Sequence, residues 1–305
     1  MERVNGYLVL DGCRCEVVNE EKGHYFVYID GEEYFYKPIT YHYKELVAYY
    51  GAKMMGIDCS FYDLAVFDKE IGYISKSFRK ENVRFVLGED ILNDYLKGER
   101  IFKEGLVRNI DVINNMGVKA LGIDSLNDYI EDCYLGSDDL NNLEIIWQAL
   151  DYRYGDKINI SKVMEQIILM YIFTIIFYDT DKQSSNWGIL ESDDDINLVP
   201  LFDNEFILND CYAGVSLSVN FNDYNFDIMD SLINFLKVSS KEFYDLFVLK
   251  FEMVEGKIDK IFELVELQIG VKIPDYDKEN MRMLFNDNCS YIRYILDGFK
   301  TRSSR

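Results

Sequence analysis

Short runs of β-branched and aromatic residues, separated by turn residues, occupy most of the N-terminal quarter of the chain. These runs predict strands at Tyr7–Leu10, Cys15–Val18, Tyr25–Ile29, Glu33–Lys37, Phe61–Phe67 and Ile71–Ser75. Asp30-Gly31 separates two of the runs and favours a tight hairpin turn. Pro38 follows Lys37 and has no N–H to donate, so we expect strand pairing to stop at Lys37.

Apolar residues recur at helical spacing elsewhere. The first such stretch, Tyr43–Met55, interrupts the strands and is followed by Gly56, the residue type that commonly ends a helix. From Gly88 onward the spacing predicts helices at Glu89–Leu96, Gly105–Met116, Ser125–Cys133, Leu140–Tyr152, Ser161–Tyr178, Ile258–Gly270 and Asp277–Phe299, and another after the capping box Ser239–Glu242. The polar segment Cys211–Phe226 predicts a loop.

Carboxylate and amide side chains follow the most apolar of these helices at informative spacings. Asp181 and Asn186 lie five residues apart on a predicted loop, and Asp203 ends a hairpin made of Trp187–Leu190 and Leu198–Phe202. Phosphoryl transfer from a nucleoside triphosphate uses such groups in this order. One carboxylate takes the proton of the attacking hydroxyl, and an amide and a second carboxylate hold magnesium. The simpler alternative is that Asp, Asn and Ser only form turns here.

Two charged residues of the β-rich segment suit the same chemistry. In a nucleotide-binding lobe, a Lys at a strand end reaches the phosphates, and a Glu from the next helix holds its ammonium group in place. Lys37 ends a predicted strand, and Glu45 lies in the first turn of the following helix. The alternative is that both are ordinary solvated surface charges.

The order of elements predicts an α+β protein with a two-lobed, protein-kinase-like fold. We expect a small β-rich N-lobe over residues 1–76, a hinge at 77–82, and a larger helical C-lobe with the catalytic loop over 83–305. An adenine ring would meet backbone donors and acceptors at the hinge, so its start predicts nucleotide contacts from Lys76, Ser77 and Phe78.

The composition disfavours several other classes of protein. The net charge of −22 provides no basic surface for nucleic acid or for an anionic membrane. With two histidines, and with Cys13 and Cys15 the only neighbouring cysteines, a zinc site is not expected. The chain does not open on a secretory signal, and the apolar stretch Ile167–Tyr178 is too short to cross a bilayer. We therefore expect a soluble, cytoplasmic protein.

Taken together, the motifs resemble those of HipA-type serine/threonine kinases, especially compact relatives that consist of the kinase region. The resemblance rests on the stretches Tyr34–Pro38, Tyr43–Ile57, Ile71–Phe78, Asp181–Leu190 and Pro200–Asn204. It implies phosphorylation of a protein Ser or Thr with ATP and Mg²⁺. The implied roles are Asp181 as base, Asn186 and Asp203 on magnesium, Lys37 on the phosphates and Glu45 holding Lys37.

The resemblance also bears on partners. Beside the protein substrate, a toxin-type member would have an antitoxin-like partner. We do not expect the extra N-terminal subdomain with which full-length members meet a DNA-bound antitoxin, so the resemblance does not imply a repressor-like partner.

Some residues depart from the family pattern and leave alternatives open. Gln183 stands where members usually carry His, and Ser185 where they often carry Lys. The expected phosphate-covering loop, Asn19–His24, holds one Gly and two carboxylates, which would repel phosphates. A small-molecule kinase with the same loop, and a pseudokinase that keeps the fold as a binding module, are the two other hypotheses.

Overall fold

The structure is a computed structural model, and the described residues are 2–38, 42–79, 82–97, 143–157, 159–179, 182, 184–193, 195–208 and 241–303. The predicted helices Gly105–Met116 and Ser125–Cys133 and the predicted loop Cys211–Phe226 lie outside the described residues.

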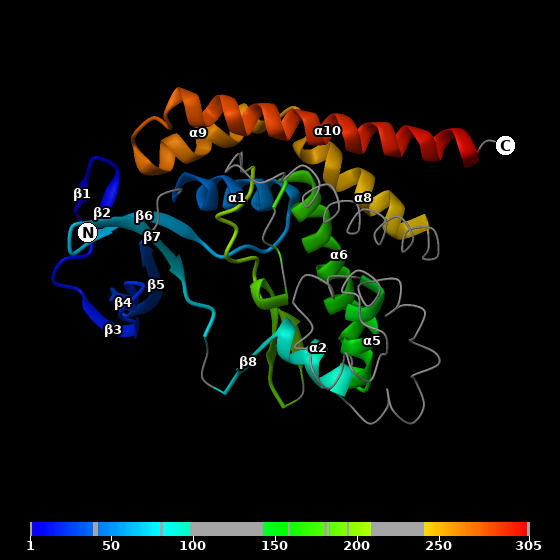
Figure 1. Cartoon of the computed structure of the whole chain (residues 1–305), viewed down its shortest axis with the longest axis horizontal. Helices are drawn as coiled ribbons and strands as arrows, with labels where there is room; N and C mark the ends of the chain where they lie inside the picture. Colours follow the sequence, from blue (N-terminus) through cyan, green and yellow to red (C-terminus); the bar gives the residue numbers. More distant parts are fainter. Residues whose placement is uncertain are drawn as a thin grey trace, which may run out of the picture.

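A seven-stranded sheet forms the N-terminal part of the molecule (Figure 1). Its strands lie in the order β1-β2-β6-β7-β5-β4-β3, and all neighbours are antiparallel except β2 and β6. The strands are β1 (Arg3–Val4), β2 (Tyr7–Val9), β3 (Arg14–Asn19), β4 (His24–Ile29), β5 (Glu32–Pro38), β6 (Tyr62–Phe67) and β7 (Glu70–Lys76). Every strand predicted in this part of the chain is present, with ends shifted by at most one residue, and β1 was not predicted.

Local turn chemistry explains the hairpins of this sheet. Asp30 and Gly31 join β4 to β5 with positive φ angles of 50° and 86°, which confirms the predicted tight turn. Strand β5 finishes at Pro38, which lies opposite Gly72 of β7, so the expectation that pairing stops at Lys37 is wrong by one residue. A Cβ at Gly72 would lie 2.2 Å from the carbonyl oxygen of Lys37, so the strands approach closely where a side chain is missing.

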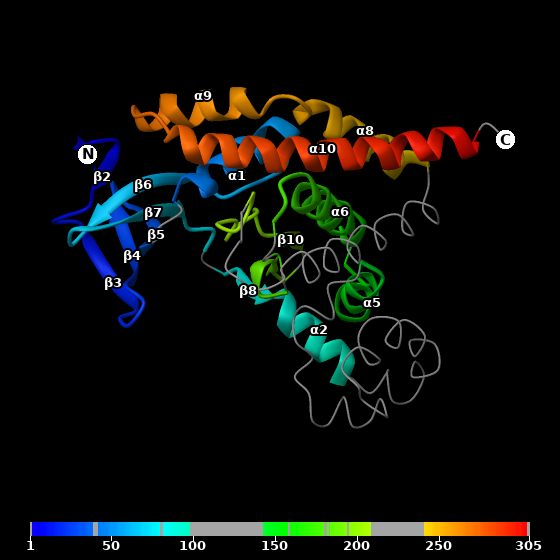
Figure 2. The same cartoon turned by 45° about the horizontal axis from the view of Figure 1, so that its top comes forward.

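Helices cover one side of the molecule (Figures 1 and 2). Helix α1 (His42–Met55) packs against β6, α8 (Lys241–Val254) and α9 (Ile258–Ile269). Helix α10 (Asp275–Ser303) packs on α9 and on α6 (Ile160–Ile176). Gly270 ends α9 in the left-handed conformation, with φ 73°.

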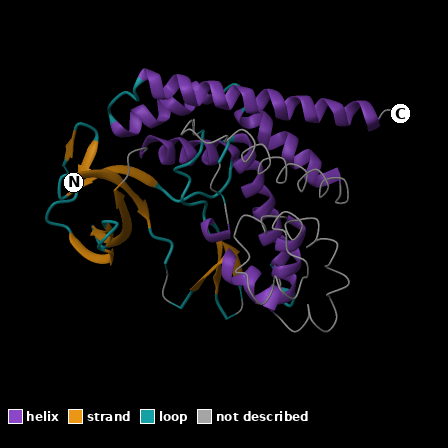
Figure 3. Ribbon diagram, in the orientation of Figure 1, coloured by secondary structure: helices purple, strands orange, loops and turns teal. Residues whose placement is uncertain are grey.

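A second sheet and the helices packed beside it form the remaining part of the chain that the structure describes (Figure 3). The sheet contains β8 (Arg84–Leu87), β9 (Gly188–Glu191) and β10 (Ile196–Leu198) in the order β10-β9-β8, and the helices are α2 (Gly88–Lys97), α5 (Leu143–Tyr154) and α6 (Ile160–Ile176). The predicted β9–β10 hairpin is present, but its second strand is Ile196–Leu198 and shares only Leu198 with the predicted run Leu198–Phe202. Strand β8 was not predicted, because its pairing with β9 is far from local in sequence.

The largest hydrophobic core runs from α1 through α6 to α9 and α10, and a smaller one fills one face of the seven-stranded sheet. One contact in the larger core fixes α1 relative to α6. A Cβ at Gly51 of α1 would lie 2.2 Å from the ring of Phe177, which directly follows α6. The ring therefore lies against the α1 backbone. Among the described residues, no helix combines the length and the apolar character that crossing a membrane needs.

Candidate active site

The site lies where the sheet, α1 and the segment after β10 meet. Cys59 forms a parallel bridge with Leu201, and the Ser60 N–H donates to the Leu201 carbonyl at 2.9 Å. The Leu201 N–H donates in turn to the Asp58 carbonyl at 2.9 Å. These bonds attach residues 201–205 to the segment between α1 and β6, and so bring Asp203 to the end of β5 that carries Lys37.

Asp203 has an unusual backbone conformation. Its φ angle is 53°, in the left-handed region that few residues other than glycine, Asn and Asp adopt. Its N–H donates to the hydroxyl of Tyr62 at 3.1 Å, which fixes the turn against β6. Strained backbone held in place by its surroundings is frequent at functional sites, and it marks Asp203 as a functional candidate.

The ammonium group of Lys37 has two carboxylate partners. Its Nζ atom lies 2.9 Å from Oδ1 of Asp203 and 2.9 Å from Oε2 of Glu205. Burial lowers the pKa of Lys37, but the two carboxylates outweigh this effect, so that its pKa lies above the ordinary value. Lys37 is therefore firmly protonated, and the structure brings it together with the predicted metal ligand Asp203.

Glu45 is fully buried and has other partners than expected. Its Oε1 accepts the Asn204 N–H at 2.9 Å, and its Oε2 accepts the Asn204 side-chain amide at 3.3 Å. Burial, and next the negative charge of Asp203, raise the pKa of Glu45 to about 8. The predicted Lys37–Glu45 ion pair is wrong for this structure: among the described residues, Lys37 pairs with Asp203 and Glu205. The reason is that both Glu45 oxygens accept hydrogen bonds from Asn204, while the Glu205 carboxylate lies 2.9 Å from the Lys37 ammonium.

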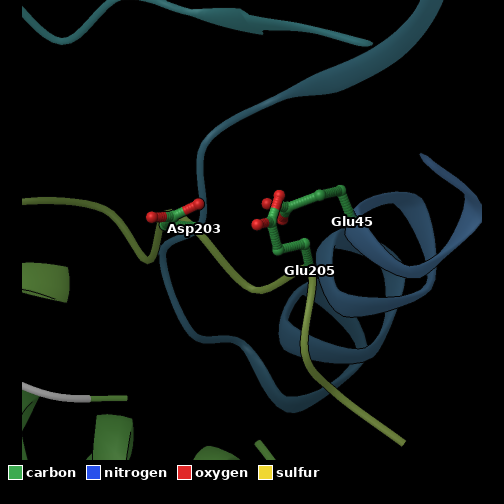
Figure 4. Close-up of side chains that lie close together, drawn as sticks. All are labelled: Glu45, Asp203 and Glu205. Carbon is green, nitrogen blue, oxygen red and sulfur yellow. The ribbon is translucent and has the colours of Figure 1, made fainter. Parts of the chain in front are cut away.

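Three carboxylates meet at this point (Figure 4). One oxygen from each of Glu45, Asp203 and Glu205 lies within 4.8 Å of the other two. Glu45 projects from α1 and Glu205 from the segment after Asp203, and burial raises the pKa of Glu205 against the opposing effect of Lys37. Clustered carboxylate oxygens are the donor set that hard divalent cations such as Mg²⁺ prefer.

Lys182 forms a buried polar centre beneath the turn. Its Nζ donates to the Phe202 carbonyl at 2.8 Å and to Oδ1 of Asn204 at 2.9 Å, and lies 3.4 Å from the buried carboxylate of Asp179. The loop after α6 and the turn around Asp203 are thus joined by one charged side chain. This side chain was not recognised in the sequence, where a Lys beside Asp181 resembles a solvated turn residue.

The other predicted site residues lie just before β9, at the predicted hinge, or outside the described residues. Asn186 is buried in a short 3₁₀ helix, Ser184–Asn186, directly before β9, whereas Asp181 and Gln183 lie outside the described residues. At the predicted hinge, Lys76 pairs with Glu32 at 2.9 Å, the Ser77 N–H donates to the Glu33 carbonyl at 3.0 Å, and Phe78 packs against Phe85 and Phe202. The nucleotide contacts of these residues, and the lobe boundaries, stay predictions.

Glu205 and Asn204 were also missed. Both follow Asp203 directly, in Asp203-Asn204-Glu205, so the signal was a second acidic residue two positions after the predicted metal ligand. That spacing alone does not show that Glu205 turns toward Lys37, because the direction depends on the left-handed backbone at Asp203.

Known proteins resemble this chain in fold and not in sequence. No model of a protein family matches the sequence, and a search of curated protein sequences found no match. Among solved structures, the chain has the fold of HipA-type kinases, which confirms the predicted α+β, protein-kinase-like architecture.

Two of these structures are similar over nearly the whole chain. The Helicobacter pylori proinflammatory kinase CtkA matches with a TM-score of 0.59 and 14% identity, over 93% of this chain and 95% of that one. The structure of the Shewanella oneidensis MR-1 toxin–antitoxin system HipA, HipB and its operator DNA matches with a TM-score of 0.54 and 13% identity, over 94% of this chain and 68% of that one. At this identity the likeness establishes the fold alone.

Proposed function

We propose that this chain is a kinase that uses ATP and magnesium to phosphorylate a Ser or Thr hydroxyl of a protein. The observation that carries the proposal is the contact between Lys37 and Asp203, which lie 166 positions apart in the sequence. One is the type of residue that contacts phosphates, and the other is the type that holds a metal ion. The fold brings them within 2.9 Å of each other.

The residues present fit a magnesium ion. Asp203 keeps 31% of its side chain exposed and has two carboxylate neighbours, so an incoming cation would find oxygen donors and excess negative charge. Asp203 and Asn186 would hold the ion. When bound, it supplies neutralisation of the phosphate charge.

The chain's own residues supply the remaining functions. Lys37 would bind the phosphates, with its ammonium released from Asp203 as that carboxylate turns to the cation. Asp181 would accept the proton of the attacking hydroxyl, as its position five residues before Asn186 suggests. The backbone near Lys76, Ser77 and Phe78 would meet the adenine ring.

The proposal also covers the acceptor of the phosphate and a partner protein. The likeness to a kinase and to a toxin–antitoxin complex supports a protein acceptor and an antitoxin-like partner. We propose no nucleic-acid or membrane contact, because the net charge is −22. The expected location is the cytoplasm.

Incubation of the purified chain with radiolabelled ATP and Mg²⁺, alone and with fractionated lysate, tests this function. We expect label on the chain itself or on a protein band, and none with Asp181→Asn. Label only in the low-molecular-weight fraction would instead identify a small-molecule kinase.

A pseudokinase is the second candidate, and one observation favours it. The turn between β3 and β4 carries Glu20 and Glu21, and the register of β4 on β5 brings this turn beside Lys37. Two carboxylates over the phosphates would weaken nucleotide binding. If the chain transfers no label to any acceptor, this second function replaces the first.

A further inference from the structure

The two carboxylates that hold Lys37 differ in their surroundings. The side chain of Asp203 is 31% exposed and that of Glu205 is 13% exposed, whereas Lys37 is 18% exposed. In Figure 4 the Asp203 carboxylate lies to one side, while the carboxylates of Glu205 and Glu45 point toward each other. The more exposed partner, Asp203, is the one that the proposed function assigns to a cation.

A Lys that contacts phosphates needs a fixed negative partner, because a long flexible side chain otherwise loses its orientation. A cation bound to Asp203 would compete with Lys37 for the charge of that carboxylate. Glu205 contacts Lys37 at the same 2.9 Å distance and is the more buried of the two. It can therefore keep its contact when Asp203 turns away.

Glu45 is unsuited to this task in the structure. Both of its oxygens accept hydrogen bonds from Asn204, at 2.9 and 3.3 Å. Turning toward Lys37 would leave the Asn204 N–H without an acceptor in a buried place, which costs about 1–3 kcal/mol. Glu45 therefore holds the turn, and the ammonium is held by another residue.

We propose that Glu205 is the positioning residue of Lys37: it keeps the Lys37 ammonium directed at the phosphate site while Asp203 serves the cation. This inference deepens the proposed function and rests on it. It assigns to Glu205 the role that the sequence alone assigned to Glu45, and leaves Glu45 to fix the Asp203 turn through Asn204.

A double-mutant cycle without nucleotide tests the pair first. The variants are Lys37→Met, Glu205→Gln and their combination, with Lys37→Met plus Glu45→Gln as the matched control, and the readout is Tm. We expect the Tm changes of Lys37→Met and Glu205→Gln to be non-additive, and those of Lys37→Met and Glu45→Gln to add. Additivity in the first cycle would overturn the proposal.

Calorimetric titration with Mg²⁺·ATP then tests the role. Glu205→Gln should raise the Kd about tenfold, the loss expected for one charge-assisted contact. In the Lys37→Met background the same change should have no effect on Kd. If Glu205→Gln weakens binding equally in both backgrounds and shifts the Mg²⁺ midpoint, then Glu205 is a metal ligand, which overturns the proposal.

The proposed kinase function and the proposed role of Glu205 can be refuted independently. If the unmutated chain does not bind Mg²⁺·ATP, the kinase function fails, and the assignment of Glu205 to phosphate binding falls with it, whatever the Tm cycle gives. If the chain binds Mg²⁺·ATP and Glu205→Gln binds as tightly as the unmutated chain, only the role of Glu205 is refuted.

Discussion

The two halves of the site contain the same kinds of side chain in different surroundings. Lys37, Asp203 and Glu205 form a partly exposed half, in which one ammonium lies between two carboxylates. Glu45, Lys182 and Asp179 belong to a buried half, in which the charged groups contact backbone atoms and Asn204.

This difference in burial separates the residues that bind ligand from those that stabilise the fold. In the partly exposed half, water or an incoming ion can replace Lys37 at Asp203, the most exposed of the three side chains, so that this contact can be exchanged at small cost. In the buried half, no solvent compensates a broken contact, so each group must keep its partner. Mutations in the buried half should therefore affect folding, and mutations in the exposed half should affect ligand binding.

The largest loss of stability is expected from Lys182→Met. It would leave the carboxylate of Asp179 buried without its ammonium partner, and would free the Phe202 carbonyl and the Asn204 side chain. We expect the free energy of unfolding in urea to fall by about 3–5 kcal/mol. The control is Lys260→Met, whose exposed pair with Glu263 is worth less than about 1 kcal/mol. Equal losses in the two variants would remove the distinction between buried and exposed charges.

Glu45→Ala should have the next largest effect. Two hydrogen bonds from Asn204 would lose their acceptor, which we expect to cost about 2–3 kcal/mol of unfolding free energy. Glu45→Gln keeps an oxygen for the Asn204 N–H, and should cost clearly less. If Gln proved as damaging as Ala, the second acceptor oxygen of Glu45, which Gln lacks, would be what supports the turn.

Lys37→Met should change stability little and binding strongly. The Lys37 pairs are partly exposed, so we expect less than about 1 kcal/mol in urea denaturation. The affinity for Mg²⁺·ATP should fall at least about tenfold in calorimetric titration. A large loss of stability with unchanged affinity would place Lys37 in the supporting half of the site.

The smallest change in stability is expected for Asp203→Asn. Asn tolerates the φ angle of 53°, and the substitution removes one negative charge from the carboxylate cluster. We expect the unfolding free energy to stay within about 0.5 kcal/mol of its value or to rise, while Mg²⁺-dependent binding of ATP is lost. Asp203→Ala is the control, since a left-handed Ala costs about 1–2 kcal/mol. Mg²⁺-dependent binding that survives in the Asn variant would exclude Asp203 as the ligand.

The sequence predicted those features that depend on neighbouring residues. The Asp30-Gly31 hairpin, the Gly56 helix end and the β9–β10 hairpin follow from local turn chemistry and periodicity, and all are present. Strand β8 was missed because its partner β9 lies about a hundred residues further along the chain, and its four residues alone do not reveal it.

The candidate site shows the same limit. Residue type and spacing identified Lys37 and Asp203, which the fold brings together. Residue type and spacing could not show that Asn204 hydrogen-bonds to Glu45, or that Glu205 turns toward Lys37. Both contacts join residues far apart in the sequence, and both depend on the left-handed backbone at Asp203. Lys182 was missed since burial of an ammonium group is rare, and no sequence signal marks it.

The contact between Gly51 and Phe177 bears on the genetics of this protein. The Phe177 carbonyl also accepts the Leu208 N–H at 2.9 Å. Helix α1, the end of α6 and the segment after Asp203 therefore meet at this residue. Any side chain at position 51 would push α1, with Glu45, away from the turn it holds. In a random-mutagenesis screen for inactive variants, Gly51 should therefore be recovered beside the residues that touch ligand. Second-site suppressors of such a variant should fall at position 177, where a smaller side chain restores the space.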